Sequence, residues 1–90
     1  MYTVYVLYSR SFDKIYIGYT SDIHERLKSH NELGQKGWTI KFRPWLLVHS
    51  EQFSDKAEAR YREKQLKGAK GRKWIWSLIN DKIKDGLISA

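Results

Sequence analysis

Two side chains that can bind an anion stand four residues apart in the first helix that the sequence predicts. Asp22 has the character of a helix N-cap, and Glu25 three residues later completes a capping-box pattern. The helix is expected to run from Asp22 to His30 or Asn31, with Arg26 and His30 on one stripe beside its apolar face. A guanidinium and an imidazole that point the same way can bind an anion, although a half-exposed helix with ordinary surface charges has the same spacing.

A second candidate is a carboxylate on the inward side of a later helix. This helix is expected from Ser54 or Asp55 to Lys67, with Ala59, Arg62, Glu63 and Leu66 sharing one side. Burying a carboxylate is costly unless it is paired or binds a metal ion. The pattern therefore allows two interpretations, a metal ligand at Glu63 or a neighbour pair of Arg62 and Glu63 at the flank of the helix.

The same region carries an unusual excess of positive charge. Between positions 60 and 73 the basic residues are Arg60, Arg62, Lys64, Lys67, Lys70, Arg72 and Lys73, against the single acid Glu63. A solvated basic helix face is the default interpretation, and a surface that contacts the phosphates of a nucleic acid is the functional one. Because most of these side chains are lysines, we expect them to grip phosphates without reading bases.

The elements that position these residues follow from periodicity and turn signals. Strands are predicted at 2–8, 15–19 and 45–51, and helices at 22–31, 55–67 and 72–84, which gives the order β-β-α-β-α-α. This order is typical of a small α+β domain with a three-stranded sheet flanked by helices. The first and third strands are nearly all apolar, so both are expected to be central. One domain is expected over residues 1–84, with residues 85–90 as a frayed tail.

The connections leave specific questions open. Gly18 interrupts the second strand, and a strand glycine often marks close approach of another backbone or a ligand. Whether Tyr5 and Tyr16 share a face depends on the hairpin register, which the sequence does not fix. The loop 31–39, which carries Lys36 and Trp38, is a candidate mobile segment over a site. Residues 70–73 are expected to form a basic hinge.

Composition narrows the class of protein. The 90 residues carry 17 basic and 10 acidic side chains, a net charge of +7, which favours a polyanionic partner such as nucleic acid. The chain has no cysteine, and it has no apolar run long enough to span a bilayer. We therefore expect a cytoplasmic protein without a membrane partner. Some of the four Trp, six Tyr and three Phe must belong to the core, but Trp and Tyr beside a basic surface can also stack on bases.

Taken together, these residues resemble the GIY-YIG nuclease superfamily, and most of all its small stand-alone bacterial members. The resemblance rests on Thr3-Val4-Tyr5, on Tyr16-Ile17-Gly18 after ten intervening residues, on Arg26 and His30 in the next helix, and on a later helical glutamate. It extends over about residues 1–80, and further similar stretches are Arg-Leu-Lys-Ser-His-Asn, Arg-Pro-Trp-Leu-Leu-Val and Arg-Glu-Lys-Gln-Leu-Lys. Two features depart from the family pattern: the first motif lacks its glycine, and a late asparagine has no clear match, Asn80 being a poor candidate.

The resemblance implies a mixed sheet and a divalent-metal phosphodiesterase site. It assigns catalytic roles to Tyr5, Tyr16, Arg26 and His30, backbone support to Gly18, and metal binding to Glu63, with Mg²⁺ or Mn²⁺ as the ion. A tyrosine, with its usual pKa of about 10, can serve as a general base only near cations. Tyr5 is the favoured base with Tyr16 orienting it, but the two roles can be exchanged, and His30 can shuttle a proton.

We therefore expect a metal-dependent endonuclease that hydrolyses phosphodiester bonds in DNA, with repair or recombination as a candidate role. The nucleic-acid contacts are assigned to Arg60, Lys64, Lys67, Lys70, Arg72 and Lys73. The alternative is a non-catalytic nucleic-acid-binding module on the same fold, and a third interpretation is a protein-interaction domain with exposed tryptophans. A homodimer or a partner protein is compatible with each of these, and the sequence does not separate DNA from RNA.

Overall fold

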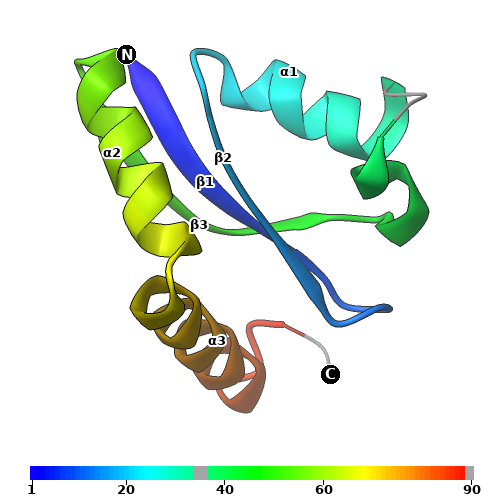
Figure 1. The fold of residues 1–90 in the computed structure, drawn as a ribbon. Helices are drawn as coiled ribbons and strands as arrows, with labels where there is room; N and C mark the ends of the chain where they lie inside the picture. The colour runs from blue at the N-terminus through cyan, green and yellow to red at the C-terminus, as the bar shows by residue number, and fades with distance from the viewer. Residues whose placement is uncertain (34–36, 89–90) are drawn as a thin grey trace.

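Three antiparallel strands form the sheet, in a computed structural model that describes residues 1–33 and 37–88. The strands are β1 (Tyr2–Ser9), β2 (Lys14–Thr20) and β3 (Leu46–Phe53), in the order β2-β1-β3 (Figure 1). Both pairings are antiparallel, so the expectation of a mixed sheet is wrong, whereas the α+β class and the element order are confirmed. The prediction that β1 is central is confirmed as well.

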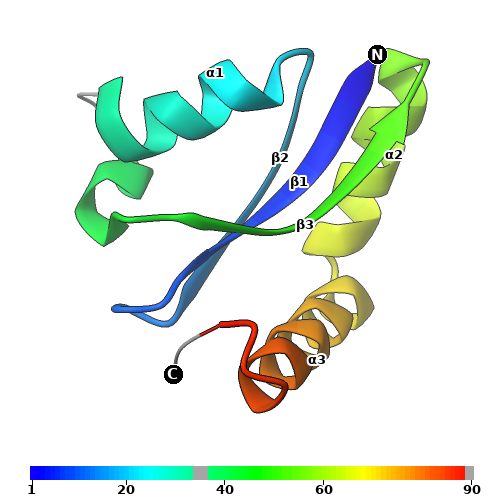
Figure 2. The ribbon, with the colours of Figure 1, turned by 180° about the vertical axis from the view of Figure 1, so that it is seen from behind.

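The strand β3 lies at an edge, contrary to the prediction that it is central. Figure 2 shows β3 beside β1 at the edge of the sheet. Its apolar run ends at Val48, and the remainder of the strand alternates between half-buried and exposed residues. The expectation failed because Trp45, which opens the apolar run, lies before the strand, and Leu46 at its start is 46% exposed. An edge position suits a strand whose second half is polar.

The hairpin register answers the question that the sequence left open. Tyr5 pairs with Gly18 and Leu7 pairs with Tyr16, so all four residues are on one face of the sheet. The turn between β1 and β2 is fixed by a hydrogen bond of 3.0 Å from the Tyr8 hydroxyl to the Asp13 carboxylate. The two motif tyrosines therefore share a face.

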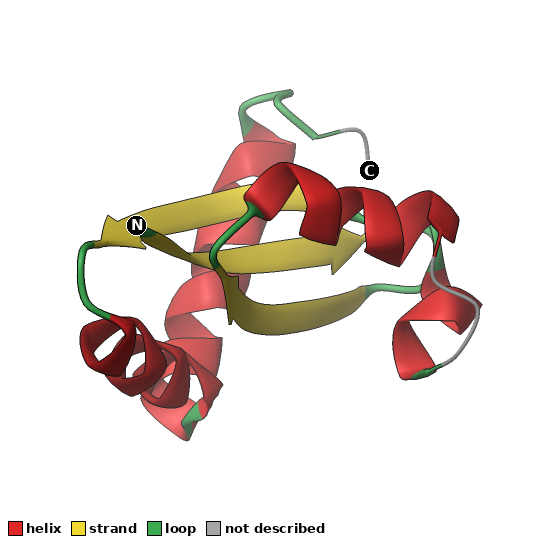
Figure 3. Cartoon of the chain, turned by 90° about the horizontal axis from the view of Figure 1, so that it is seen from above, coloured by secondary structure: helices red, strands yellow, loops and turns green. Residues whose placement is uncertain are grey.

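Helices cover the two faces of the sheet separately (Figure 3). One face packs against α2 (Lys56–Lys67) and α3 (Ala69–Lys84), and its core is formed by Val4, Val6, Tyr8, Ile15, Ile17, Val48, Ala59, Leu66, Ile75, Ile79 and Ile88. The other face packs against α1 (Ile23–Lys28), a π-helical turn (Ser29–Leu33) and a 3₁₀ helix (Trp38–Phe42). This second, smaller core is built around Tyr5, Leu7 and Trp45.

A close crossing of α2 and α3 depends on one glycine that the sequence analysis did not single out. A Cβ atom on Gly71 would lie 2.3 Å from the Gln65 carbonyl oxygen and 2.5 Å from the Leu66 Cα atom. Gly68 ends α2 as predicted and is also the N-cap of α3. Residues 70–73 therefore belong to α3, and the expectation of a basic hinge there is wrong because the break is confined to Gly68.

The C-terminal segment differs from the expected frayed tail in its described part. Ile88 is 5% exposed and packs in the larger core. The backbone N–H groups of Leu87 and Ile88 both donate to the carbonyl of Lys82. Residues 85–88 are therefore packed on the end of α3, and residues 89–90 lie outside the described part. Within the described residues, no helix is long and apolar enough to cross a membrane.

Candidate active site

The centre of the candidate site is a buried contact between Tyr5 and His30. The Tyr5 side chain comes from β1 and is 1% exposed, and its hydroxyl group lies 3.1 Å from Nε2 of His30. Nδ1 of His30 lies 3.2 Å from the hydroxyl of Thr39, so both ring nitrogens have a partner. The ring of Tyr16 lies 4.7 Å from the His30 ring and 6.1 Å from the Tyr5 ring. Three predicted site residues thus meet at one point.

Gly18 adjoins the Tyr5 hydroxyl because the two residues are paired across the hairpin. A Cβ atom at position 18 would lie 2.6 Å from the Tyr5 hydroxyl oxygen and 2.8 Å from the ring carbon that bears it. No side chain larger than hydrogen fits there without moving Tyr5. The close approach predicted at Gly18 is therefore made by the Tyr5 side chain, which lies against the Gly18 backbone.

Burial and neighbouring charges shift the pKa values of both central groups. The pKa of Tyr5 is raised, first by burial and then by Tyr16, with a further rise from Glu63, while Arg26 acts in the opposite direction. The pKa of His30 is lowered, first by burial and then by the charges of Arg26 and Arg43. Near neutral pH the phenol is therefore protonated and the imidazole is neutral. A protonated phenol can donate its hydrogen to a neutral imidazole nitrogen.

Arg26 lies at the solvent side of this centre. It is exposed on α1, one turn before His30, and its charge acts on both Tyr5 and His30. Its guanidinium forms no hydrogen bond or salt bridge with another residue in the described part of the chain. The predicted stripe of Arg26 and His30 is thus present in part, because His30 turns inward and is 8% exposed while Arg26 remains available to an anion.

Glu63, the predicted metal ligand, lies on α2. Its side chain is 18% exposed and forms a salt bridge of 3.6 Å with Lys67, one turn further along the helix. Its negative charge contributes to the raised pKa of Tyr5, after burial and Tyr16. Glu63 also lines a surface depression together with Arg60, Tyr61 and Lys64.

The alternative pairing of Arg62 with Glu63 is wrong, because Arg62 has another partner. Its Nε and Nη2 atoms donate to the two carboxylate oxygens of Glu51 on β3, at 2.8 and 3.0 Å. Glu51 also contacts His49 at 2.7 Å, and the Arg62 guanidinium lies over the ring of Trp74. This pairing lowers the pKa of Glu51, mainly through the hydrogen bond from Arg62. It joins α2 to the sheet one residue before Glu63.

The donor set near Glu63 limits which metal ion it can hold. Among the described residues, no group of three or more His, Cys, Asp or Glu side chains is placed to bind one ion. A closed protein cage for a transition metal is therefore absent from this part of the chain. A single carboxylate fits Mg²⁺, which commonly keeps several waters and takes its remaining ligands from substrate phosphates.

The predicted nucleic-acid-binding residues are divided between α2 and α3. Arg60 and Lys64 flank Glu63, and Lys67 pairs with it. Lys70 instead lines a separate depression with Trp74, and the Arg72 side chain donates to the carbonyl of Lys67 at 3.3 Å. The sequence run is divided because α3 turns away from α2 at Gly68. Lys73 is exposed on α3.

Residues that sequence reasoning did not assign to the site hold His30 in place. Arg43 donates to the backbone carbonyls of Ser29 and His30, and Trp45 donates from its indole to the Thr39 carbonyl at 2.8 Å. The Asn31 amide bonds the backbone of Trp45 in both directions. Part of the loop that was expected to be mobile is thus a 3₁₀ helix bound to this framework, and Lys36 lies outside the described residues. The only signal in the sequence was the family-like stretch that contains Arg43 and Trp45.

The fold is that of the GIY-YIG class, and the chain belongs to that family: the GIY-YIG catalytic domain matches residues 1–76. The resemblance predicted from the motifs is confirmed. The chain is therefore a member of a nuclease family.

Its relatives carry the name UPF0213. The chain is 42% identical over 66 residues to a UPF0213 protein of Bacillus velezensis, which covers 70% of this chain and 67% of the relative. It is 37% identical over 67 residues to a UPF0213 protein of Halobacterium salinarum, covering 74% of this chain and 86% of the relative. The solution structure of a UPF0213 protein of Bacillus halodurans superposes with a TM-score of 0.51 at 28% identity, over 87% of this chain and 85% of the other.

Proposed function

We propose that this protein is a Mg²⁺- or Mn²⁺-dependent endonuclease that hydrolyses phosphodiester bonds in DNA. The observation that supports the proposal is the hydrogen-bonded pair of Tyr5 and His30, with Tyr16, Arg26 and Glu63 acting on the same point. Repair or recombination remains the candidate role. The positive net charge of +7 favours the polyanionic substrate.

Each residue has a role that its surroundings support. Arg26 binds the phosphate oxygens, since its guanidinium is exposed and suited to a fork-like contact. Tyr5 takes the proton of the attacking water while its own proton moves to Nε2 of His30, which overcomes the raised pKa of an isolated phenol. Thr39 fixes the orientation of the imidazole for this transfer. Glu63 would hold a divalent ion, which would supply charge neutralisation on the phosphoryl oxygens.

The test is cleavage of branched, flapped, single-stranded and duplex DNA by the purified protein with Mg²⁺ or Mn²⁺. We expect cleavage of at least one substrate, its loss in Glu63→Ala, and loss of most activity in Arg26→Ala with the fold intact. Glu58→Ala, which removes an exposed acid of the same helix, is the matched control and should remain active. Equal activity of the Glu63→Ala and Glu58→Ala variants would show that the carboxylate of Glu63 has no catalytic role.

The second candidate function is a nucleic-acid-binding module without catalysis. It is favoured by Arg60 and Lys64, two exposed cations on α2 that can contact phosphates in the absence of any metal ion. DNA binding that is unchanged by EDTA and by Glu63→Gln, with no turnover of any substrate, would select this function.

A further inference from the structure

An exposed aromatic patch lies next to the candidate active site and is not used by the proposed chemistry. Trp38 is 48% exposed and Phe12 is 49% exposed, and the ring of Phe42 lies between them at 4.6 and 5.4 Å. The Nζ atom of Lys14 lies 5.7 Å from the centre of the Phe42 ring. We call Phe12, Lys14, Trp38 and Phe42 the aromatic platform.

The platform is connected to the site by a row of rings. Trp38 lies 5.8 Å from the buried ring of Trp45, with 38° between their planes, and Trp45 lies 6.4 Å from Tyr16. Tyr16 in turn contacts His30. One side of Trp38 is thus held by packed aromatic neighbours, while about half of its surface faces solvent. A ring held in this way can receive a second flat group at little conformational cost.

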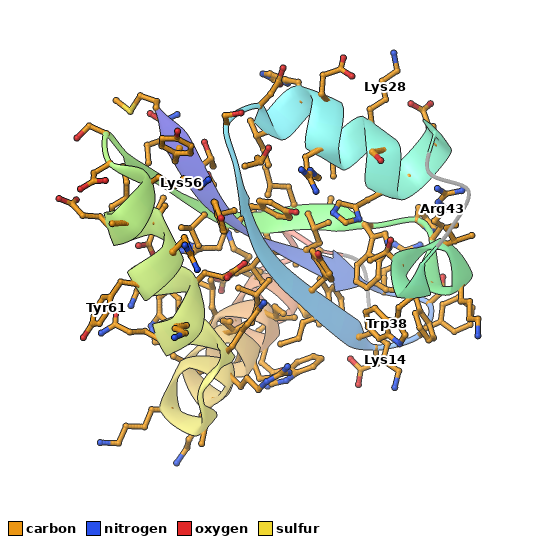
Figure 4. All side chains as sticks on the ribbon, turned by 45° about the horizontal axis from the view of Figure 1, so that its top comes forward. Lys14, Lys28, Trp38, Arg43, Lys56 and Tyr61 are labelled. Carbon is orange, nitrogen blue, oxygen red and sulfur yellow. The ribbon has the colours of Figure 1, made fainter. Side chains whose placement is uncertain are left out.

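The charge around the platform favours an anionic strand. Lys41 follows Trp38 by three residues in the 3₁₀ helix, a spacing that places both on one side of it. The ammonium group of Lys14 lies over the Phe42 ring of the platform. The nearby acid Asp13 accepts a hydrogen bond from the Tyr8 hydroxyl. In Figure 4, Trp38 and Lys14 project from one end of the molecule, far from Tyr61 on α2. Flat rings interleaved with lysines match a nucleic-acid strand, in which bases alternate with phosphates.

We propose that the aromatic platform stacks an unpaired nucleobase of a strand that is bound at the candidate active site. The proposal rests on the proposed function for its substrate class, and it adds a preference for unpaired strands. A base inside a duplex has both faces covered by its neighbours, so only a single-stranded, flapped or extruded nucleotide can offer a face to Trp38. The platform would therefore direct the enzyme to junctions where a strand leaves the duplex.

The experiment measures binding in EDTA, so that its outcome does not depend on cleavage. Fluorescence anisotropy would compare a labelled short single-stranded DNA with the corresponding duplex for wild type, Trp38→Ala, Trp38→Phe, Phe12→Ala and Trp74→Ala. We expect Trp38→Ala to weaken single-strand binding by about tenfold and to leave duplex binding nearly unchanged, because stacking on an aromatic ring contributes this order of affinity per base. Trp38→Phe should retain most of the affinity, and Phe12→Ala should show a smaller loss of the same kind.

Trp74→Ala is the matched control, since Trp74 is 43% exposed but lies on α3 against His49, on the other side of the sheet. Equal single-strand affinity of wild type, Trp38→Ala and Phe12→Ala would overturn the platform while the proposed nuclease function stands if DNA is still cut. Equal losses in Trp38→Ala and Trp74→Ala would also overturn it. Selective loss in a protein that never cleaves DNA would support the platform and contradict the nuclease, whereas absence of all DNA binding would overturn both.

Discussion

The hydroxyl group of Tyr5 lies 3.1 Å from Nε2 of His30, although the two residues are 25 positions apart in the chain. The contact joins the central strand to the π-helical turn that follows α1, beside the smaller core of the molecule. It gives the phenol an acceptor for its proton in a place where burial raises the pKa of the phenol and lowers that of the imidazole. The proposed chemistry depends on this pair.

The first prediction concerns the protonation of His30. Its pKa should lie below the usual value of about 6.5 because of burial and the charges of Arg26 and Arg43, so the imidazole is neutral at pH 7. Replacing Arg26 by Gln should raise this pKa, and replacing the exposed Lys28 by Gln should change it less. The ¹H–¹⁵N NMR titration of the histidine ring measures it directly. A pKa of His30 above the ordinary value would contradict the neutral acceptor.

The same shift predicts how stability depends on pH. Between the lowered pKa of His30 and about 6.5, the unfolded chain binds more protons at this site than the folded protein does. The contribution of His30 to the free energy of unfolding should therefore rise with pH across this window and level off above it. Urea denaturation of wild type and His30→Gln across the window separates this contribution from that of other groups, and a variant with an identical pH profile would rule it out.

The second prediction concerns Gly18. In Gly18→Ala the new Cβ atom would meet the Tyr5 hydroxyl at 2.6 Å, so the phenol must move away from His30. We expect the free energy of unfolding to fall by about 1–3 kcal/mol, as for other overpacked interiors, together with loss of DNA cleavage. Gly68→Ala is the control, because its Cβ atom would have no neighbour closer than 3.4 Å. Urea denaturation and cleavage assays of both variants check this, and an active, fully stable Gly18→Ala would show that Tyr5 need not occupy this position.

The third prediction concerns the ion pair between Arg62 and Glu51. Because the two side chains are 32% and 25% exposed, solvent screens the pair, and its coupling should be about 1 kcal/mol or less. A double-mutant cycle with Arg62→Gln and Glu51→Gln, followed by urea denaturation, measures this coupling. If the pair positions α2, Arg62→Gln should also reduce Mg²⁺-dependent cleavage, because Glu63 follows on the same helix. Arg62→Lys should restore little of this activity, because an ammonium group cannot donate to both carboxylate oxygens in the geometry of a guanidinium. Full activity of Arg62→Gln would limit the pair to a structural role.

The fourth prediction separates the two parts of the basic run. Arg60 and Lys64 flank Glu63, so the double variant Arg60→Ala/Lys64→Ala should flatten the log–log salt dependence of duplex binding by about two units if both side chains contact phosphate. Lys70→Ala/Lys73→Ala removes the same charge from α3 and should have less effect. Binding isotherms at several salt concentrations give the slopes. A larger change in the α3 variant would place the phosphate-binding surface beyond the turn at Gly68.

Local signals in the sequence were sufficient to predict the elements and several individual side chains. Asp22 and Asp55 are the N-caps of α1 and α2, as their side-chain types and spacing predicted. Gly68 ends α2, and Glu63 occupies the inward flank of that helix. Such features depend on contacts between residues three or four positions apart, which a sequence states directly. The motif types and their spacing were likewise enough to indicate the family.

Only the tertiary structure decided which distant residues meet. The hairpin register put Tyr5 opposite Gly18, and a single-residue shift would have turned one of the two tyrosines to the other face. The edge position of β3 and the pairing of Arg62 with Glu51 depend on how α2 folds back over the sheet. The burial of Ile88 depends in the same way on how α3 ends. These contacts join residues whose separation along the chain says nothing about their distance, because burial of the two sheet faces, and not local propensity, selects among the possible pairings.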